Sequence, residues 1–129
     1  MKGYLCGGIF GLDDGAVNNW RTTAKERMPD IEWVDPMRRD YRGKEAGNCR
    51  AIVEDDLADI AGCDFLLVWA ETPSWGTAME MVYARQQGKR IVTFCRGTIS
   101  PWLQYHSSVI VWSWRDAETA IRSKVMRDG

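Results

Sequence analysis

Short apolar runs alternate along this chain with stretches whose apolar residues recur at helical spacing. The apolar runs predict strands at Tyr4–Cys6, Ile31–Val34, Phe65–Trp69, Ile91–Cys95 and Val109–Trp112. The stretches between them predict helices at Ala16–Met28, Arg50–Ala61, Thr77–Gln87 and Asp116–Met126. Two polar segments, Asp35–Gly47 and Arg96–Ser107, are predicted to be loops.

This alternation predicts the α/β class, with a doubly wound, flavodoxin- or Rossmann-like sheet of parallel strands and helices on both faces. The runs FLLVW and IVTF are almost continuously apolar, as in strands that are buried on both sides. No repeat, low-complexity segment or linker interrupts the chain, so we expect one domain over residues 1–129. If the strand order is the common 2-1-3-4-5, ligands bind beyond the carboxyl ends of the strands, where the order reverses. The loops that follow the first and third strands would flank that crevice.

The composition narrows the class of protein. A formal net charge of −1 gives no overall attraction to a nucleic acid polymer or an acidic membrane. No apolar run reaches about 18 residues, so no transmembrane helix is expected, and the first apolar run is too short for a signal peptide. Seven tryptophans in 129 residues are unusual. We expect several of them to line a pocket or a contact between subunits of a homo-oligomer.

The cysteines argue against a metal site. They are widely spaced and form no CxxC motif, and the chain has one histidine. We interpret them as reduced core thiols of a cytoplasmic protein. The four are Cys6, Cys49, Cys63 and Cys95.

The stretch from Asp64 to Ile91 holds the strongest chemical signal. A strand, a loop with Ser74 and Gly76, and a helix follow one another, and the free N–H groups at a helix start suit an anionic ligand. Ser74 and Gly76 offer a hydroxyl and a close backbone N–H to a phosphate, although plain turn chemistry explains them equally. Glu80 is expected in the first helical turn, where the dipole would keep it ionised as a nucleophile. The alternative is a capping box, Thr77-x-x-Glu80.

A second carboxylate stands out in the helix predicted before that strand. Asp56 shares its face with apolar residues, whereas Asp55 and Asp59 are expected to point into solvent. Desolvation would raise the pKa of Asp56 and suit it to general acid work. An aspartate at the rim of the face, bonded to a nearby loop, is the alternative. Two carboxylates in different environments are the arrangement that cleaves glycosidic bonds.

Tyr4 and the glycines after it complete the candidate site. The Tyr4 hydroxyl at the end of the first strand could orient one of the carboxylates, or it could simply be a satisfied core group. The Gly7-Gly8 turn only weakly resembles a phosphate loop, because GGIFG is not GxGxxG. Arg38, with Arg39 and Arg42, is a candidate phosphate clamp, and a solvated basic loop is the alternative. His106 is too isolated to be assigned a role.

Together these residues resemble the nucleoside 2-deoxyribosyltransferase superfamily, including its nucleotide N-glycosidase branch. The resemblance rests on YLCGGIF, WVDPMRRDYRG, EDDLADIAGCDFLLVW, PSWGTAMEMVYARQQGK and SPWLQYHS. It implies that Glu80 is the nucleophile that forms a covalent glycosyl-enzyme, that Asp56 is the second carboxylate, and that Tyr4 orients Glu80. Ser74 falls where family members acting on nucleoside 5′-monophosphates carry a phosphate-binding serine, and members acting on free nucleosides carry an aspartate.

The resemblance also implies a dimer that completes its sites across the interface, with residues near 102–108 reaching the neighbouring pocket. The chain is shorter than the larger transferases and lacks their C-terminal extension, which argues against base exchange.

The sequence therefore predicts an enzyme that cleaves or transfers at the N-glycosidic bond of a 2′-deoxynucleoside or its 5′-monophosphate. Glu80, Asp56 and Tyr4 are the predicted catalytic residues, and substrate binding is predicted for Gly7, Gly8, Ser74, Gly76 and Arg38. No metal or organic cofactor is expected. A non-catalytic nucleotide-binding or sensor module of the same fold is the alternative, and a small scaffold with a tryptophan-rich assembly surface is a third.

Overall fold

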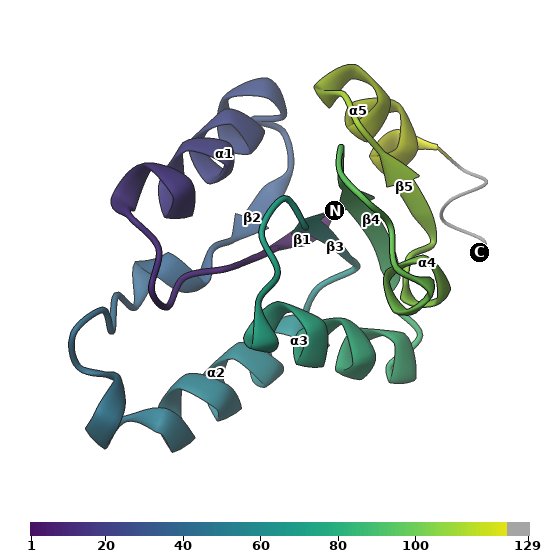
Figure 1. Ribbon diagram of the computed structural model, residues 1–129. Coiled ribbons are helices and arrows are strands. Elements are labelled where there is room, and N and C mark those ends of the chain that lie inside the picture. The colour runs from purple at the N-terminus through teal and green to yellow at the C-terminus, as the bar shows by residue number, and fades with distance from the viewer. Residues whose placement is uncertain (124–129) are drawn as a thin grey trace.

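A computed structural model describes residues 1–123 of the chain. Its centre is a parallel sheet in the order β2-β1-β3-β4-β5, which confirms the predicted order and fold class (Figure 1). The strands are β1 (Lys2–Gly7), β2 (Glu32–Val34), β3 (Phe65–Trp69), β4 (Arg90–Phe94) and β5 (Val109–Val111).

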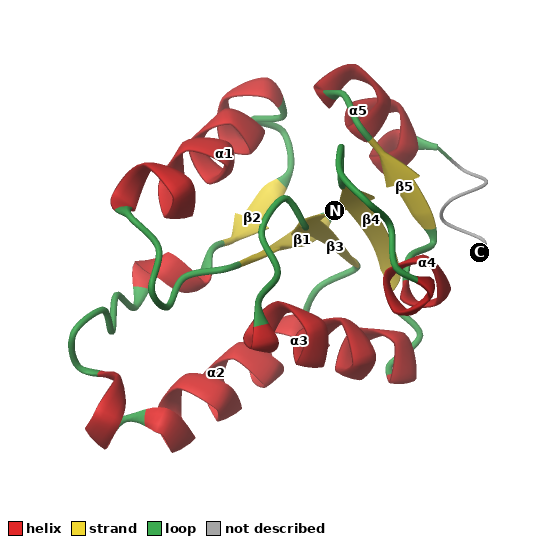
Figure 2. Ribbon diagram, viewed as in Figure 1, coloured by secondary structure: helices red, strands yellow, loops and turns green. Residues whose placement is uncertain are grey.

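Helices cover both faces of the sheet (Figure 2). On one face lie α1 (Asp14–Arg27) and α5 (Trp114–Arg122), and on the other lie α2 (Cys49–Ala61) and α3 (Trp75–Gln86). The short α4 (Pro101–His106) lies beside α3. Two 3-10 turns, η1 (Pro36–Arg38) and η2 (Glu45–Gly47), lie between β2 and α2.

Several predicted boundaries are wrong for identifiable reasons. The expected loop Arg96–Ser107 contains α4, in which Pro101 occupies the first turn and the Ser100 hydroxyl accepts a hydrogen bond from Leu103 N at 3.1 Å. Proline is suited to a first helical position, so the Ser-Pro pair was a helix start rather than a loop signal. The expected loop Asp35–Gly47 likewise contains η1 and η2.

The last helix also begins earlier than expected. Its N-cap is Ser113, whose hydroxyl accepts from Asp116 N at 3.1 Å, so Trp114 is already helical. The predicted end of this helix at Met126 lies outside the described residues.

The sheet separates two cores of different composition. Beneath α1 and α5, the Trp69 ring stacks on Trp20 at 5.5 Å, on Phe94 at 4.6 Å and on Trp114 at 5.8 Å between ring centroids. Gly7 makes this packing possible, because a Cβ there would lie 2.6 Å from the Trp20 ring. This core is closed and aromatic.

The core beneath α2 and α3 contains more polar chemistry. Tyr4 and Cys6 of β1 are fully buried there, beside Ile60 of α2 and Met81 of α3. Cys63 and Cys95 are buried as expected, but Cys49 is exposed at the start of α2, so the prediction of four core thiols is wrong for that residue. The candidate site lies on this side of the sheet.

Candidate active site

Strand β1 points two functional groups at one carboxylate of α3. Tyr4 and Cys6 are two residues apart, so their side chains leave the strand on the same face. The Tyr4 hydroxyl donates to Glu80 Oε2 at 2.6 Å, and the Cys6 thiol lies 3.5 Å from Glu80 Oε1. The structure thus brings Tyr4 and Glu80 together as predicted. Cys6 was missed as a site residue, although its spacing from Tyr4 would have placed it there.

Glu80 occupies the second turn of α3 rather than the first. The helix begins at Trp75 because Ser74 is its N-cap, with Ser74 Oγ accepting from Thr77 N at 3.3 Å. A capping box centred on Thr77 is therefore wrong, and Glu80 is free of any capping duty. Its carboxylate reaches the sheet instead.

The charge on Glu80 is disfavoured by its surroundings. Burial raises the pKa of Glu80 from 4.5 to about 7, and the negative charge of Asp56 adds to this, whereas the bonds from Tyr4 and Cys6 lower it. The expectation that the helix dipole keeps this group fully ionised is wrong, since the dipole fades beyond the first turn. Burial and the nearby Glu80 also raise the pKa of Tyr4 and of Cys6, so both remain protonated donors.

Asp56 lies on α2 with its side chain 20% exposed. Burial raises its pKa to about 6, partly opposed by Arg39, whose Nη2 lies 3.4 Å from Asp56 Oδ1. Asp56 is partly buried as predicted, and its contact with Arg39 in the segment after β2 also matches the alternative of a rim aspartate bonded to a nearby loop. Asp59 is not an ordinary solvated charge, because it accepts from Arg38 at 2.8 Å and from Arg39 at 2.6 Å.

The basic residues after β2 are held by carboxylates. Arg38 donates to Asp59 and to the Asp35 carbonyl at 3.0 Å, and Arg42 pairs with Asp40 and Asp14. The phosphate role of Arg38 stays a prediction. Arg39 and Arg42 also line a small cavity of about 110 Å³, which they share with Asp56. Glu45 also lines this cavity, together with aromatic and aliphatic side chains: Ile9, Phe10, Pro36, Met37, Tyr41 and Ile52.

The predicted phosphate-binding groups come together at the start of α3. A Cβ on Gly8 would lie 3.4 Å from Ser74 Cβ, so the turn after β1 passes directly beside the helix N-cap. Gly76 lies in the first turn, where backbone N–H groups lack helical partners. Gly7, in contrast, is fixed by the tryptophan packing on the other face of the sheet.

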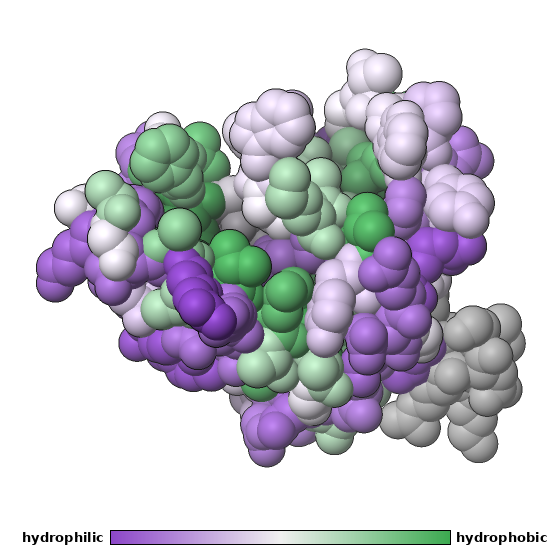
Figure 3. All heavy atoms as spheres, turned by 90° about the horizontal axis from the view of Figure 1, so that it is seen from below, coloured by the Kyte–Doolittle hydropathy of each residue, from purple (hydrophilic) through white to green (hydrophobic). Residues whose placement is uncertain are grey.

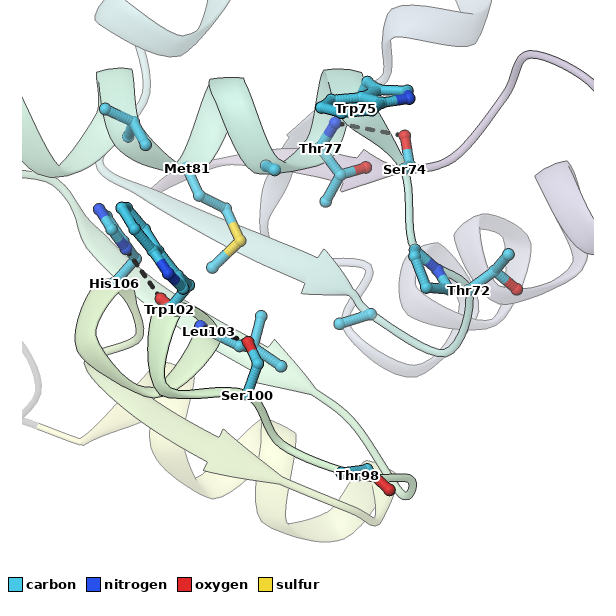
Figure 4. Close-up of a pocket in the computed structure, with 14 residues that line it drawn as sticks. Thr72, Ser74, Trp75, Thr77, Met81, Thr98, Ser100, Trp102, Leu103 and His106 are labelled. Atoms are coloured by element: carbon cyan, nitrogen blue, oxygen red, sulfur yellow. Dashed lines mark hydrogen bonds between the residues drawn. The ribbon is translucent and has the colours of Figure 1, made fainter.

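A larger pocket of about 590 Å³ opens between α3 and α4 (Figure 4). Ser74 and Thr77 lie at one end, and Trp102 and His106 lie at the other, with Met81 between them. His106 Nδ1 is 2.8 Å from the Trp102 carbonyl, and the two rings are stacked 6.1 Å apart. The residues that line this pocket include no aspartate or glutamate.

The face that carries α2 and α3 exposes large apolar side chains. Seen from this side, apolar and pale residues gather near the centre and hydrophilic residues lie around them (Figure 3). Trp75 is 85% exposed, Trp102 77%, and Met79 and Tyr105 each 65%. Apolar exposure of this kind marks an interaction surface.

Within residues 1–123, no three His, Cys, Asp or Glu side chains are grouped as a metal site would require. None of the helices in this part of the chain combines the length and the apolar character needed to cross a membrane.

The chain matches one known protein family. The family model described as nucleoside 2-deoxyribosyltransferase matches residues 4–107. No curated protein sequence matches the chain.

Several solved structures share the fold. A 2-deoxyribosyltransferase from Bacillus psychrosaccharolyticus is 16% identical, with a TM-score of 0.79 over 98% of this chain and 96% of that one. A 2-deoxyribosyltransferase from Leishmania mexicana is 25% identical, with a TM-score of 0.59 over 84% and 73% of the two chains. A CMP N-glycosidase from Clostridium botulinum is 14% identical, with a TM-score of 0.55 over 95% and 100%.

Proposed function

The chain belongs to the nucleoside 2-deoxyribosyltransferase family, and on that premise we propose that it breaks the N-glycosidic bond of a 2′-deoxynucleoside or its 5′-monophosphate. The observation that carries this proposal is the 2.6 Å hydrogen bond from Tyr4 to Glu80, made beside a second carboxylate, Asp56, with a raised pKa. A tyrosine that holds one carboxylate oxygen leaves the carboxylate oriented for attack.

The reaction follows from the two carboxylates. Ionised Glu80 attacks C1′, and the C1′–N bond breaks as the new C1′–O bond forms. The base leaves with the bonding electron pair and takes the proton of Asp56. Water or the nitrogen of a second base then attacks C1′ and gives its proton to ionised Asp56, while the C1′–O bond to Glu80 breaks and frees the carboxylate. Water would make the protein a hydrolase, and a second base would make it a transferase.

The protonation states impose a condition on this mechanism. Attack needs Glu80 ionised, with a pKa of about 7, while Asp56 is protonated, with a pKa of about 6. The charge of Asp56 raises the pKa of Glu80, so the two groups titrate as a coupled pair, and protonation of Asp56 itself favours ionised Glu80. Hydrogen bonds from Tyr4 and Cys6 also favour ionised Glu80.

We assign the phosphate end of the substrate to Ser74, Gly76 and the Gly7-Gly8 turn. The support is the proximity of Gly8, Ser74 and Gly76 at the start of α3, together with a neighbouring pocket whose lining residues include no carboxylate. A phosphate dianion there meets a hydroxyl and helix N–H groups without repulsion. These features favour a 5′-monophosphate over a free nucleoside. The proposed mechanism uses no metal or organic cofactor.

We also propose that the exposed apolar face over α3 and α4 is a homodimer interface. Trp75, Trp102 and Tyr105 carry the large apolar area that a stable dimer covers. The chain is proposed to act as one domain in the cytoplasm, where its free cysteines would remain reduced.

A base-release assay tests the proposed reaction. The purified protein is incubated with nucleosides and nucleoside 5′-monophosphates, with and without a second free base, and products are separated by chromatography. Release from monophosphates supports a nucleotide hydrolase, and exchange that requires the added base supports a transferase. Tight nucleotide binding by calorimetry without any product would instead establish the non-catalytic binding module.

Ser74→Asp is a matched specificity variant. Aspartate is also a good N-cap, so α3 should be retained while a negative charge is placed at the proposed phosphate position. We expect KM for the monophosphate to rise by about 100-fold, because like charges at contact distance repel strongly when water is excluded. An equal loss for nucleoside and monophosphate would contradict the phosphate assignment.

A further inference from the structure

Arg21 is a charged side chain buried in the closed core, 1% exposed. It belongs to α1, the helix on the opposite face of the sheet from Glu80. A guanidinium in such surroundings carries a large desolvation penalty unless its N–H groups are paired. The contacts of Arg21 therefore indicate its role in the fold.

The edge of β1 beside β2 has carbonyl groups that no neighbouring strand can bind. β2 pairs with β1 only as far as Tyr4, opposite Val34. On this edge Glu32 N donates to Met1 O, and the later carbonyls facing the same way belong to Leu5 and Gly7. The chain beyond Val34 continues into Asp35 and Pro36, and proline has no N–H to offer.

Arg21 supplies the missing donors. Its Nη2 lies 3.4 Å from Leu5 O and 3.2 Å from Gly7 O, in the place that a longer β2 would have taken. Its Nη1 donates to Val17 O at 2.7 Å, and its Nε lies 3.4 Å from Asp35 Oδ1. The fork of one guanidinium thus joins α1, the end of β1 and the segment after β2.

Asp35 is itself held in place. It accepts from Met37 N at 2.9 Å and from Lys25 Nζ at 2.6 Å, so the carboxylate beside Arg21 has little freedom. The Arg21 guanidinium also lies 4.7 Å from the centroid of the Trp20 ring. Arg21 is therefore a fixed part of the fold rather than a mobile surface cation.

The carbonyls that Arg21 binds flank the residue that contacts Glu80. Cys6 lies between Leu5 and Gly7, and its thiol is 3.5 Å from Glu80 Oε1. Gly8, which passes beside Ser74, follows directly. Movement of this short segment would displace both the thiol and the turn.

We propose that Arg21 is a positioning residue, which fixes the end of β1 so that Cys6 and the Gly7-Gly8 turn are held against Glu80 and Ser74. Its effect on rate rests on the proposed function, but its effect on the ionisation of Glu80 does not.

The groups around Glu80 determine how a substitution of Arg21 should change the pKa of Glu80. Tyr4 and Cys6 act from β1, Asp56 acts from α2, and Arg21 acts from α1. Among these, the hydrogen bonds and the Arg21 charge lower the pKa of Glu80, and the Asp56 charge raises it. Loss of Arg21 should therefore raise the pKa of Glu80 above its present value of about 7.

Kinetics of Arg21→Met and Arg21→Lys test the positioning role. We expect kcat to fall about 100-fold for methionine and about tenfold for lysine, which keeps the charge but loses the fork, with KM changed by no more than about threefold. Arg27→Met is the matched control, because it removes an arginine of the same helix that pairs with Glu118 and touches neither Asp35 nor the β1 carbonyls. It should leave kcat unchanged.

Titration of Glu80 provides a readout that does not need activity. Carbon-13 NMR of protein labelled at the glutamate carboxyls follows Glu80 directly, with its signal assigned by its absence in Glu80→Gln. The midpoint should rise in Arg21→Met and stay near the wild-type value in Arg21→Lys.

Each outcome decides the proposal. A variant with a lower melting temperature but unchanged kcat and an unchanged Glu80 midpoint would show a merely structural arginine and overturn it. If Arg21→Met does not fold, Arg21→Lys decides, since equal kcat with wild type would also overturn it. If the wild-type protein releases no base, the proposed function fails while the Glu80 midpoint still tests Arg21.

Discussion

The same strands form both faces of the sheet, but one face packs a closed core and the other carries the candidate site. Beneath α1 and α5, Trp20, Trp69 and Trp114 stack around Phe94 in a closed core. Beneath α2 and α3, a tyrosine hydroxyl, a thiol and a carboxylate lie within the core and close to an open pocket. Period-two alternation along β1 allows this separation, because Leu5 faces one side and Tyr4 the other.

The difference teaches how a small domain supports an unfavourable site. Each aromatic pair adds about 0.5–1.5 kcal/mol to the free energy of unfolding beyond the burial of its area, so the closed face stabilises the fold. The open face contains acids whose pKa values are raised because burial disfavours their charge. Stability and chemistry are thus assigned to different sides of one sheet, and variants on each side should affect one property far more than the other.

The largest expected effect is the loss of turnover in Glu80→Gln. Glutamine keeps an oxygen to accept from Tyr4 but cannot form the glycosyl ester, so kcat should fall by at least about a thousandfold. Chromatographic measurement of free base under substrate saturation checks this. Retention of substantial turnover would contradict the role of Glu80.

Next in size is the loss of stability in Trp69→Ala. Removal of the central ring of the aromatic cluster should lower the free energy of unfolding by about 3–5 kcal/mol, because the space can collapse only in part. Urea denaturation followed by circular dichroism measures it. The folded fraction should keep kcat within about threefold, and a large loss of kcat per folded molecule would break the division between the faces.

Glu80→Gln should also stabilise the protein, in a manner that depends on pH. The folded pKa of Glu80 is raised from 4.5 to about 7, so the unfolded chain releases this proton first and wild-type stability falls as pH rises through that interval. Above pH 7 the variant should be more stable by about 2 kcal/mol, after allowance for solvent around a half-buried group. The difference should vanish at about pH 4, and a constant difference at both pH values would assign the gain to packing instead.

The smallest predicted effect concerns Tyr4→Phe. The pH profile of kcat/KM for the wild-type enzyme should fall on both sides of a maximum, with limbs at about 6 and about 7. Loss of the hydrogen bond to Glu80 should move the upper limb to higher pH and lower the maximum about tenfold. An upper limb that does not move would show that Tyr4 does not tune Glu80.

Local pattern was enough to predict most of the fold. The apolar runs at β3 and β4 and the spacing of helical segments determine the parallel sheet, and its order was confirmed. The errors fall at the ends of helices, where a single capping residue determines the boundary. Ser74, Ser100 and Ser113 each begin a helix before the residue at which the apolar pattern becomes visible.

The sequence indicated which residues to expect in the candidate site but not the surroundings of their side chains. The sequence placed Tyr4, Ser74 and Glu80 near one another, and the structure brings Tyr4 and Glu80 into contact. It could not give the raised pKa of Glu80, because that value depends on burial by strands that are distant along the chain. Arg21 was not predicted for the same reason, since nothing near it in sequence shows that β2 stops at Val34 and leaves the Leu5 and Gly7 carbonyls without strand partners.

The tryptophans also provide intrinsic optical probes of the structure. Trp20 and Trp69 are stacked in the closed core, so near-ultraviolet circular dichroism follows the packing of that face. Trp75, Trp102 and Trp112 are exposed, and a dissolved quencher of fluorescence reaches them first. Two light-based signals from the unlabelled chain therefore distinguish loss of the aromatic core from coverage of the pocket.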